Sequence, residues 1–255
     1  MRTLVLGDIH GGFRALIQCF KLSKFNYLED KLIVLGDVCD GWAEVRQCID
    51  DLLRVKNLVF VLGNHDEWAG DWFDHIRKYV KSDYVPKPEL QWTSQGGLAT
   101  LKSYDDTDQF SEPAVGIDYR KIQMPKEHLD LLENAPTFYV ENNRLFVHGG
   151  IDPQTKADGQ PKDMHLWDRT LIHNAYHRSK QKGAKKLKLT PYDEVFVGHT
   201  TTRYYGIDEP MHCGNIWNLD TGGGWGGKLT IMDVDTKEYW QSDVVKTLYP
   251  EEKGR

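Results

Sequence analysis

The 255-residue chain has the composition of an ordinary folded protein, and its charge argues against some classes of function. Hydrophobic residues make up 40% and charged residues 27% of the sequence, so neither a disordered nor a fibrous protein is indicated. The formal net charge of -6 argues against a broad basic surface, and we expect no stable complex with nucleic acid. A lysine cluster between residues 180 and 188 could meet an anionic partner, but a solvated loop or helix end is the expectation.

The length of the chain indicates how many domains to expect, and its cysteine content indicates the cellular compartment. A chain of this size can bury one large core, so we expect a single domain over residues 1–255. The four cysteines show no CxxC spacing and follow no signal-peptide pattern, which predicts reduced thiols in the cytoplasm. The apolar stretch from Leu4 to Leu6 is far shorter than the roughly 20 residues that span a bilayer. No membrane association is therefore expected, and the sequence carries no signal for an oligomeric state.

The first third of the chain alternates strand and helix patterns. Short apolar runs predict strands, and amphipathic segments between them predict helices; the order is Thr3 to Leu6, Phe13 to Leu22, Leu32 to Leu35, Glu44 to Leu53, and Leu58 to Leu62. Such a βαβαβ pattern predicts parallel strands, whose ligand site lies beyond their carboxyl ends. The loops 7–11, 36–41 and 63–66 should therefore converge on one rim.

The periodicity fades between about residues 82 and 120, which predicts an inserted lobe or lid. Its aromatic residues Trp92, Tyr104 and Phe110 could stack a nucleobase, although packing in the core of the lid is the simpler expectation. A second strand-rich half follows, with a tight turn at Asn142-Asn143; its strands are Thr137 to Glu141, Arg144 to Val147, Glu194 to Val197, Ile216 to Leu219, Lys228 to Val234, and Glu238 to Asp243.

Six potential metal ligands follow the predicted strands, each in a glycine-containing loop: Asp8, His10, Asp37, Asn64, His148 and His199. Each alone has an ordinary explanation, such as a helix cap for an aspartate, a turn for Asn64, or a hydrogen-bonded loop histidine. Their recurrence at five strand ends favours a metal centre. Carboxylate, imidazole and amide oxygen together suit two divalent ions, with Mn²⁺ first and Fe²⁺, Zn²⁺, Ni²⁺ or Mg²⁺ as alternatives.

A pair of ions needs a bridging ligand, and the two oxygens of a carboxylate can serve both ions. We expect Asp37 to be this bridge. One ion would be held by Asp8, His10 and Asp37, and the other by Asp37 together with Asn64, His148 and His199.

These loops carry an ordered set of motifs: Gly7-Asp8-Ile9-His10-Gly11, Gly36-Asp37-Val38-Cys39-Asp40, Gly63-Asn64-His65-Asp66, His148-Gly149-Gly150 and Gly198-His199-Thr200. The set resembles the calcineurin-like metallophosphoesterases, in particular the PPP branch of serine/threonine phosphatases and bacterial dinucleoside-polyphosphate phosphatases. Leu166-Trp167-Asp168-Arg169 and Asp220-Thr221-Gly222 add weaker similarity. The resemblance implies an α/β fold, a four-layer α/β/β/α sandwich of two mixed sheets, and the ligand roles given above.

The resemblance also implies roles for other residues. His65 would protonate the leaving alkoxide, and Asp40 would orient its imidazole. Eukaryotic-type protein phosphatases carry an arginine directly after the second motif, where this chain has Gly41. The phosphate must then be gripped elsewhere, and Arg169 is the expected replacement, together with Asn64; a surface ion pair is the other explanation of Arg169.

The expected function is two-metal hydrolysis of phosphate monoesters, most similar to a protein serine/threonine phosphatase. The substrate would be a phosphorylated protein or a small phosphoester. Hydrolysis of dinucleoside polyphosphates or RNA-end phosphates is the alternative, motivated by Gly41 and by the aromatic residues of the predicted lid. An inactive metal-binding scaffold is disfavoured because all six ligands and both acid-base residues are present.

Overall fold

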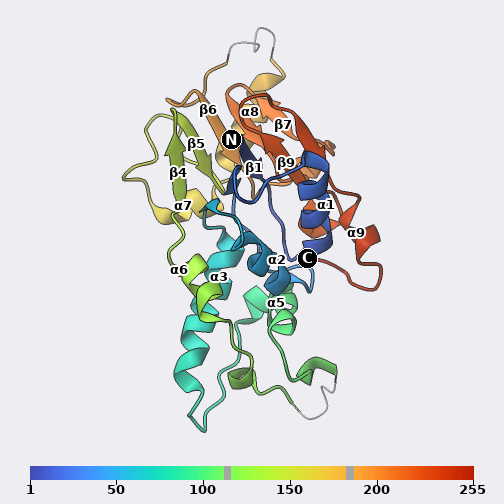
Figure 1. Cartoon of the computed structure of the whole chain (residues 1–255). Coiled ribbons are helices and arrows are strands. Elements are labelled where there is room, and N and C mark those ends of the chain that lie inside the picture. Colours follow the sequence, from blue (N-terminus) through green and yellow to red (C-terminus); the bar gives the residue numbers. More distant parts are fainter. Residues whose placement is uncertain (112–115, 182–186) are drawn as a thin grey trace.

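Two five-stranded mixed sheets form the centre of the molecule (Figure 1). The computed structural model describes residues 1–111, 116–181 and 187–255. The lysine cluster at 180–188 therefore falls largely outside the described residues. Within the described part of the chain, no helix combines the length and the apolar character needed to cross a membrane.

The first sheet has the order β10-β9-β1-β2-β3. Its parallel strands are β1 (Thr3–Leu6), β2 (Lys31–Val34) and β3 (Asn57–Phe60), connected by α1 (Phe13–Ser23) and α2 (Val45–Leu52). The antiparallel strands β9 (Thr230–Asp233) and β10 (Tyr239–Gln241) complete it. The βαβαβ arrangement expected for the first third of the chain is confirmed.

The second sheet has the order β4-β5-β6-β8-β7. Its strands are β4 (Phe138–Glu141), β5 (Arg144–Val147), β6 (Glu194–Val197), β7 (Met211–Cys213) and β8 (Ile216–Asn218). Strands β5, β6 and β8 run parallel, whereas β4 and β7 are antiparallel edges. The sequence did not predict β7, because a three-residue strand centred on the exposed His212 is too short to show a period.

Successive side chains along each strand point to opposite faces of the sheet, and the buried apolar residues therefore form three separate packing layers. Leu4 and Leu6 contact the helical layer of α1 and α2, whereas Val5 faces the opposite sheet. Between the sheets, the rings of Phe146 and Phe196 stack with centroids 4.9 Å apart. The outer face of the second sheet packs on α8 (Thr170–Ser179). The four-layer α/β/β/α sandwich is therefore confirmed.

The remaining helices lie mainly below the sheets in Figure 1, where α3, α5 and α6 gather. Their bounds are α3 (Asn64–Ile76), α4 (Leu90–Trp92), α5 (Leu98–Ser103), α6 (Lys126–Glu133), α7 (Lys162–Trp167) and α9 (Val245–Leu248). A π-helical turn (Thr93–Gly97) joins α4 to α5. Short 3-10 turns occur at Arg77–Tyr79, Gln109–Ser111, Tyr119–Lys121, Thr202–Tyr205 and Gly223–Trp225.

The region expected as an inserted lobe forms short helices that pack on the main core. Trp92, Leu101 and Tyr104 are buried in the same apolar cluster as α1 and α2. The Tyr104 hydroxyl also bonds His128 Nδ1 at 2.9 Å. Trp92 and Tyr104 thus serve core packing and are not exposed for stacking a nucleobase, while Phe110 is partly buried against the same cluster.

Candidate metal centre

The predicted ligands come together because the parallel strands end at one place. Asp8 follows β1, Asp37 follows β2, His148 follows β5 and His199 follows β6. Several of these residues leave their strands in a strained left-handed conformation, with positive φ angles at His10 (49°), Asp37 (51°), Asp40 (70°) and His199 (62°). Such backbone costs on the order of 1–3 kcal/mol per residue and typically marks functional sites.

One group of ligand atoms belongs to Asp8, His10 and Asp37, which all lie within 4.8 Å of one another. His10 Nδ1 bonds Cys39 O at 2.9 Å. Because the carbonyl can only accept, the proton of the neutral ring is on Nδ1 and the lone pair is at Nε2, which lies 3.5 Å from Asp37 Oδ2. Asp8 Oδ2 accepts the His199 amide at 3.0 Å, so that its Oδ1 is free to face the centre.

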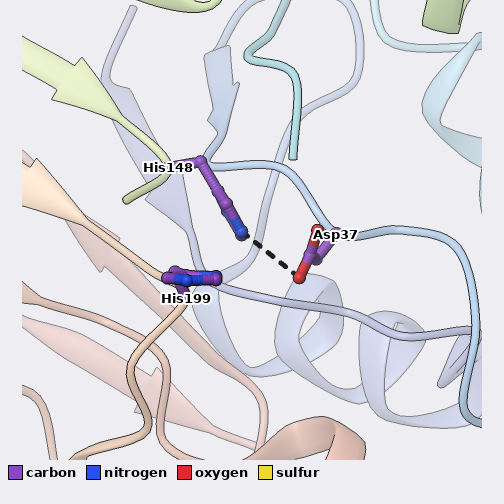
Figure 2. Close-up of side chains that lie close together, drawn as sticks. All are labelled: Asp37, His148 and His199. Atoms are coloured by element: carbon purple, nitrogen blue, oxygen red, sulfur yellow. Dashed lines mark ion pairs between the residues drawn. The ribbon is translucent and has the colours of Figure 1, made fainter. Parts of the chain in front are cut away.

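A second group consists of Asp37, His148 and His199, again within 4.8 Å (Figure 2). His148 Nδ1 bonds Leu35 O at 2.7 Å, which turns Nε2 towards Asp37 Oδ2 at 3.3 Å. The same Nε2 lies 3.0 Å from Asn64 Oδ1. Asp37 thus belongs to both groups, the position that a bridging carboxylate requires.

Unpartnered polar atoms test whether these residues fit metal ions. Burial without a partner costs about 1–3 kcal/mol for each polar group. Within the described chain such atoms concentrate here: Asp8 Oδ1, Asp37 Oδ2, Asn64 Nδ2, His65 Nε2, and both ring nitrogens of His199. The carboxylate oxygens and a histidine ring nitrogen among these atoms offer lone pairs that suit divalent cations of the Mn²⁺, Fe²⁺ or Zn²⁺ kind, whereas Asn64 would bind through Oδ1 and not through its amide nitrogen. The residues therefore fit two metal ions, whose identity this donor set does not select.

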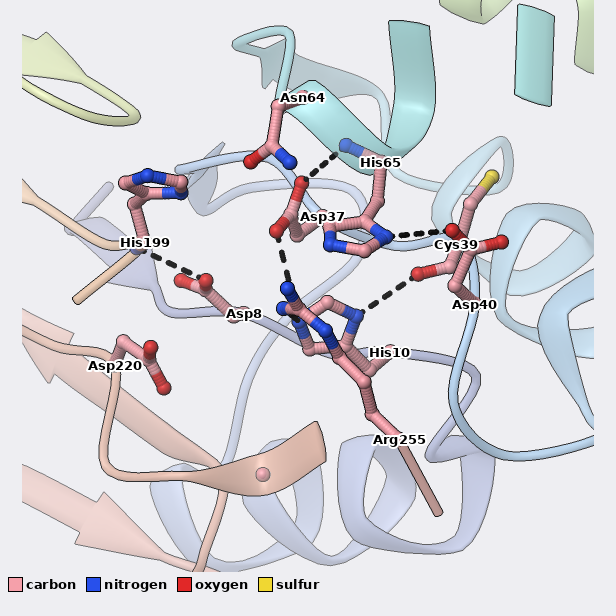
Figure 3. Close-up of polar contacts among 12 residues, drawn as sticks. Asp8, His10, Asp37, Cys39, Asp40, Asn64, His65, His199, Asp220 and Arg255 are labelled. Carbon is pink, nitrogen blue, oxygen red and sulfur yellow. Dashed lines mark hydrogen bonds and ion pairs between the residues drawn. The ribbon is translucent and has the colours of Figure 1, made fainter. Parts of the chain in front are cut away.

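The pair of His65 and Asp40 borders this centre (Figure 3). His65 Nδ1 lies 2.6 Å from Asp40 Oδ2. Asp40 also accepts hydrogen bonds from Thr100 Oγ1 at 2.6 Å and from Trp92 Nε1 at 3.0 Å. Burial raises the pKa of Asp40 well above its usual range, and the bonds from Thr100 and Trp92 offset this only in part. Because His65 Nδ1 lies against an oxygen of this carboxyl group, a proton on Nδ1 has an acceptor there.

The environment of His65 favours its neutral form. Burial lowers its pKa to about 3, although the nearby Asp37 carboxylate acts in the opposite direction. His65 Nε2 is buried and has no hydrogen-bond partner within the described residues. A negatively charged group placed against Nε2 would favour the protonated ring.

Asp66 holds the loop that carries Asp37. Its carboxylate accepts the amides of Asp37 at 2.7 Å, Val38 at 2.9 Å and Cys39 at 3.0 Å. It also accepts Gly63 N at 3.1 Å. Asp66 lies in the Gly63-Asn64-His65-Asp66 motif, but no role was predicted for it from the sequence. Its position three residues after Gly63, at the start of α3, was the available signal for a capping carboxylate.

Arg169, the residue expected to bind phosphate, lies beside the candidate ligand His199. It precedes α8, and its Nη1 donates to His199 O at 2.9 Å and to Thr200 Oγ1 at 3.2 Å. The guanidinium therefore stands beside the His199 ligand. Within the described chain Arg169 forms no ion pair with a carboxylate, which disfavours a purely structural surface ion pair.

An aromatic wall extends from the centre to a neighbouring pocket. The Trp68 ring centroid lies 5.1 Å from His65 and 5.0 Å from Trp167, and Trp167 lies 5.9 Å from His199. Trp68 also lines a pocket of about 570 Å³ together with Trp72, His75, Lys87 and Glu89. Trp68 and Trp167 are both partly exposed.

Comparison with known proteins decides the family. The sequence profile of the calcineurin-like phosphoesterases matches residues 1–203. The chain belongs to this family. Calcineurin-like phosphoesterases depend on a binuclear metal centre, and the two groups that share Asp37 are this chain's candidate ligands for it.

Two curated relatives extend over nearly the whole chain of this calcineurin-like phosphoesterase. Symmetrical bis(5'-nucleosyl)-tetraphosphatase of Pseudomonas putida is 24% identical and covers 95% of this chain and 93% of its own. Serine/threonine-protein phosphatase 1 of Salmonella typhimurium is 25% identical over 90% of both chains. Among solved structures, a metallophosphoesterase from Sphaerobacter thermophilus superposes with a TM-score of 0.54 at 18% identity, over 96% of this chain and 89% of its own, which supports the fold.

Proposed function

We propose that this protein hydrolyses phosphoesters with two divalent metal ions, and that dinucleoside polyphosphates are its substrates. The observation that carries the first part is the position of Asp37 in both groups of converging ligand atoms, several of which are buried without a hydrogen-bond partner among the described residues. The ions would be held by Asp8, His10 and Asp37 on one side, and by Asp37, Asn64, His148 and His199 on the other. Bound there, they would supply Lewis-acid stabilisation of charge on phosphate and lower the pKa of a water.

The residues of the chain supply proton transfer and orientation. Asp40 holds the Nδ1 proton of His65, which directs Nε2 towards the centre. The imidazole is neutral in the free site, and the negative charge of a bound phosphate would favour its protonation at Nε2. From there the proton can pass to the oxygen of the departing group as the bond between that oxygen and phosphorus breaks, which is a phosphoanhydride bond in a dinucleoside polyphosphate. Arg169 would bind phosphate oxygen next to His199.

Two observations support a dinucleoside polyphosphate as substrate. Symmetrical tetraphosphatases are among the relatives that align over nearly the full chain. In addition, Trp68 contacts His65 and also lines a pocket of about 570 Å³ that has further aromatic residues in its wall. A phosphate at the centre and a base against Trp68 would use both features, because stacking on an aromatic ring is worth about 1–3 kcal/mol per base.

Protein phosphatase activity is the second candidate function. It is the function that the sequence motifs favour most directly. The alignment with serine/threonine-protein phosphatase 1 supports it. The two candidates are tested by turnover of the Mn²⁺-loaded protein on diadenosine tetraphosphate and on a phosphoserine peptide at equal concentration. We expect the higher kcat/KM on diadenosine tetraphosphate, with two ADP as products. Faster turnover of the peptide would replace this proposal with the second candidate.

A further inference from the structure

The segment 249–255 folds back onto the candidate metal centre. The Ala43 amide donates to Glu252 Oε2 at 2.9 Å, and the Arg255 amide donates to Gly224 O at 2.9 Å. The rings of Trp42 and Tyr249 stack with centroids 5.1 Å apart. The segment is thus attached to the loop that follows Asp40 and to the glycine-rich turn at Gly223–Trp225.

The loop after Asp40 is shaped to receive this segment. At Gly254 the backbone has a φ of 73°, and a Cβ would lie 2.8 Å from the ring atoms Cη2 and Cζ2 of Trp42. A Cβ at Gly41 would lie 3.1 Å from His10 Cβ and 3.7 Å from Arg255 Cβ. Gly41, where eukaryotic-type protein phosphatases carry arginine, therefore leaves space beside Arg255, and the ring of Trp42 packs against Gly254.

The guanidinium of Arg255 reaches a candidate metal ligand (Figure 3). Its Nη1 lies 3.3 Å from His10 Nε2, and its Nη2 donates to Gln95 Oε1 at 3.4 Å. The guanidinium carbon stands 5.0 Å from the centroid of the Trp225 ring. Arg255 Nε is buried and has no hydrogen-bond partner in the described chain. The planar donor group is held at the centre with part of its hydrogen-bonding capacity unused.

The charge of Arg255 acts on the whole centre. Between the described residues Arg255 forms no direct ion pair, and its charge acts at longer range on the Asp40 and Asp220 carboxyl groups, whose pKa values burial raises and this charge lowers. Burial lowers the pKa of Arg169, and the charge of Arg255 lowers it further. Two positively charged guanidinium groups therefore lie close enough to repel each other. Arg169 lies beside His199, and Arg255 lies beside His10. A multiply charged oxyanion is the ligand that would satisfy both.

We propose that Arg255 binds the phosphate group of the substrate and supplies the guanidinium that the Gly41 loop lacks. Arg169 and Arg255 would hold phosphate oxygens from the His199 side and the His10 side of the centre. This inference rests on the proposed phosphoester hydrolysis. It assigns the phosphate-binding role to a residue nearly 90 positions away from Arg169 and outside every motif.

Inorganic phosphate is the ligand for the test, since its binding is measured without turnover. Isothermal titration calorimetry would determine its affinity for the Mn²⁺-loaded wild type, Arg255→Ala, Arg255→Lys and the control Lys253→Ala. Lys253 is an exposed cation of the same segment. We expect Arg255→Ala to weaken phosphate binding by about tenfold or more, because bonds to charged groups are strong. Arg255→Lys should lose less affinity, and Lys253→Ala should lose none.

Titration of Mn²⁺ into the same metal-stripped proteins separates two roles of Arg255, namely phosphate binding and competition with the metal ion at His10. The inference expects Arg255→Ala to bind Mn²⁺ at least as tightly as the wild type while binding phosphate less tightly. Tighter Mn²⁺ binding with unchanged phosphate affinity would overturn it, since Arg255 would then only compete with the cation at His10. A wild type that takes up Mn²⁺ but binds no phosphate would contradict the proposed function as well.

Discussion

His65 Nδ1 lies 2.6 Å from Asp40 Oδ2, and both side chains are fully buried. Asp40 is in turn fixed by Thr100 and Trp92, which come from the helical region that the sequence predicted as a lid. The proposed acid-base pair is therefore oriented by residues about 60 positions away in the chain. This link between the helical region and the loop that carries Asp40 leads to the first two predictions.

Replacing His65 with alanine should remove turnover while the metal ions remain. The ring donates or accepts a proton but is not among the candidate ligands, so kcat on an aryl phosphate should fall by about a hundredfold or more. Steady-state kinetics and Mn²⁺ calorimetry on the same preparation measure the two effects. A variant that turns over near the wild-type rate would remove His65 from the mechanism.

Trp92→Phe should lower kcat with little change in KM. The substitution keeps the ring but removes the indole N–H that donates to Asp40. We expect a roughly three- to tenfold loss, the size of one net hydrogen bond. Trp72→Phe is the matched control, because Trp72 Nε1 is buried without a partner in the described chain. Equal effects of the two substitutions would show that packing, and not the bond to Asp40, is responsible.

Trp68→Ala should affect a nucleotide substrate more than a small one. If a base stacks on Trp68, its removal should raise KM for diadenosine tetraphosphate by about fivefold or more, in line with stacking energies of about 1–3 kcal/mol. KM for an aryl phosphate should change less. Tyr84→Ala, at a tyrosine that is 65% exposed, serves as the control. Parallel changes for both substrates would argue against a base site at Trp68.

The pair of Arg2 and Asp30 predicts a pH-dependent stability. Burial alone would raise the pKa of Asp30, but hydrogen bonds from Arg2 and Asn26 outweigh it and lower the pKa below the usual value of 3.8. A lowered carboxyl pKa stabilises the fold above the unfolded value, and this contribution is lost as the pH falls through the folded value. Asp30→Asn should therefore lower Tm at pH 7, and the difference from wild type should shrink below about pH 4.

Thermal melts between pH 3 and pH 7 measure this effect. Asp208→Asn is the control, because this carboxylate is paired with Arg203 at an exposed site. A Tm difference for Asp30→Asn that stays constant over the whole range would contradict the assignment of the pKa shift to Asp30.

Local patterns in the sequence were enough to place the candidate ligands together, but they did not reveal the residues that support them. Strand ends followed by glycine placed Asp8, Asp37, His148 and His199 on one rim, because parallel strands carry their carboxyl ends to the same edge. The bond from Trp92 to Asp40 and the approach of Arg255 to His10 depend on how distant segments pack. No periodicity or spacing reports such contacts. The short strand Met211–Cys213 was missed for a related reason, since its pairing with β8 defines it.

Hydrolysis of an aryl phosphate by metal-stripped protein, titrated with Mn²⁺, tests the central claim most directly when wild type and Asp37→Asn are compared. The account predicts that wild-type activity is absent without metal and rises to saturation at two Mn²⁺ per chain. Asp37→Asn should remain inactive and bind fewer ions, because Asp37 belongs to both groups of ligands. Activity that does not depend on added metal, or an Asp37→Asn variant that binds two ions and turns over normally, would contradict the two-metal centre.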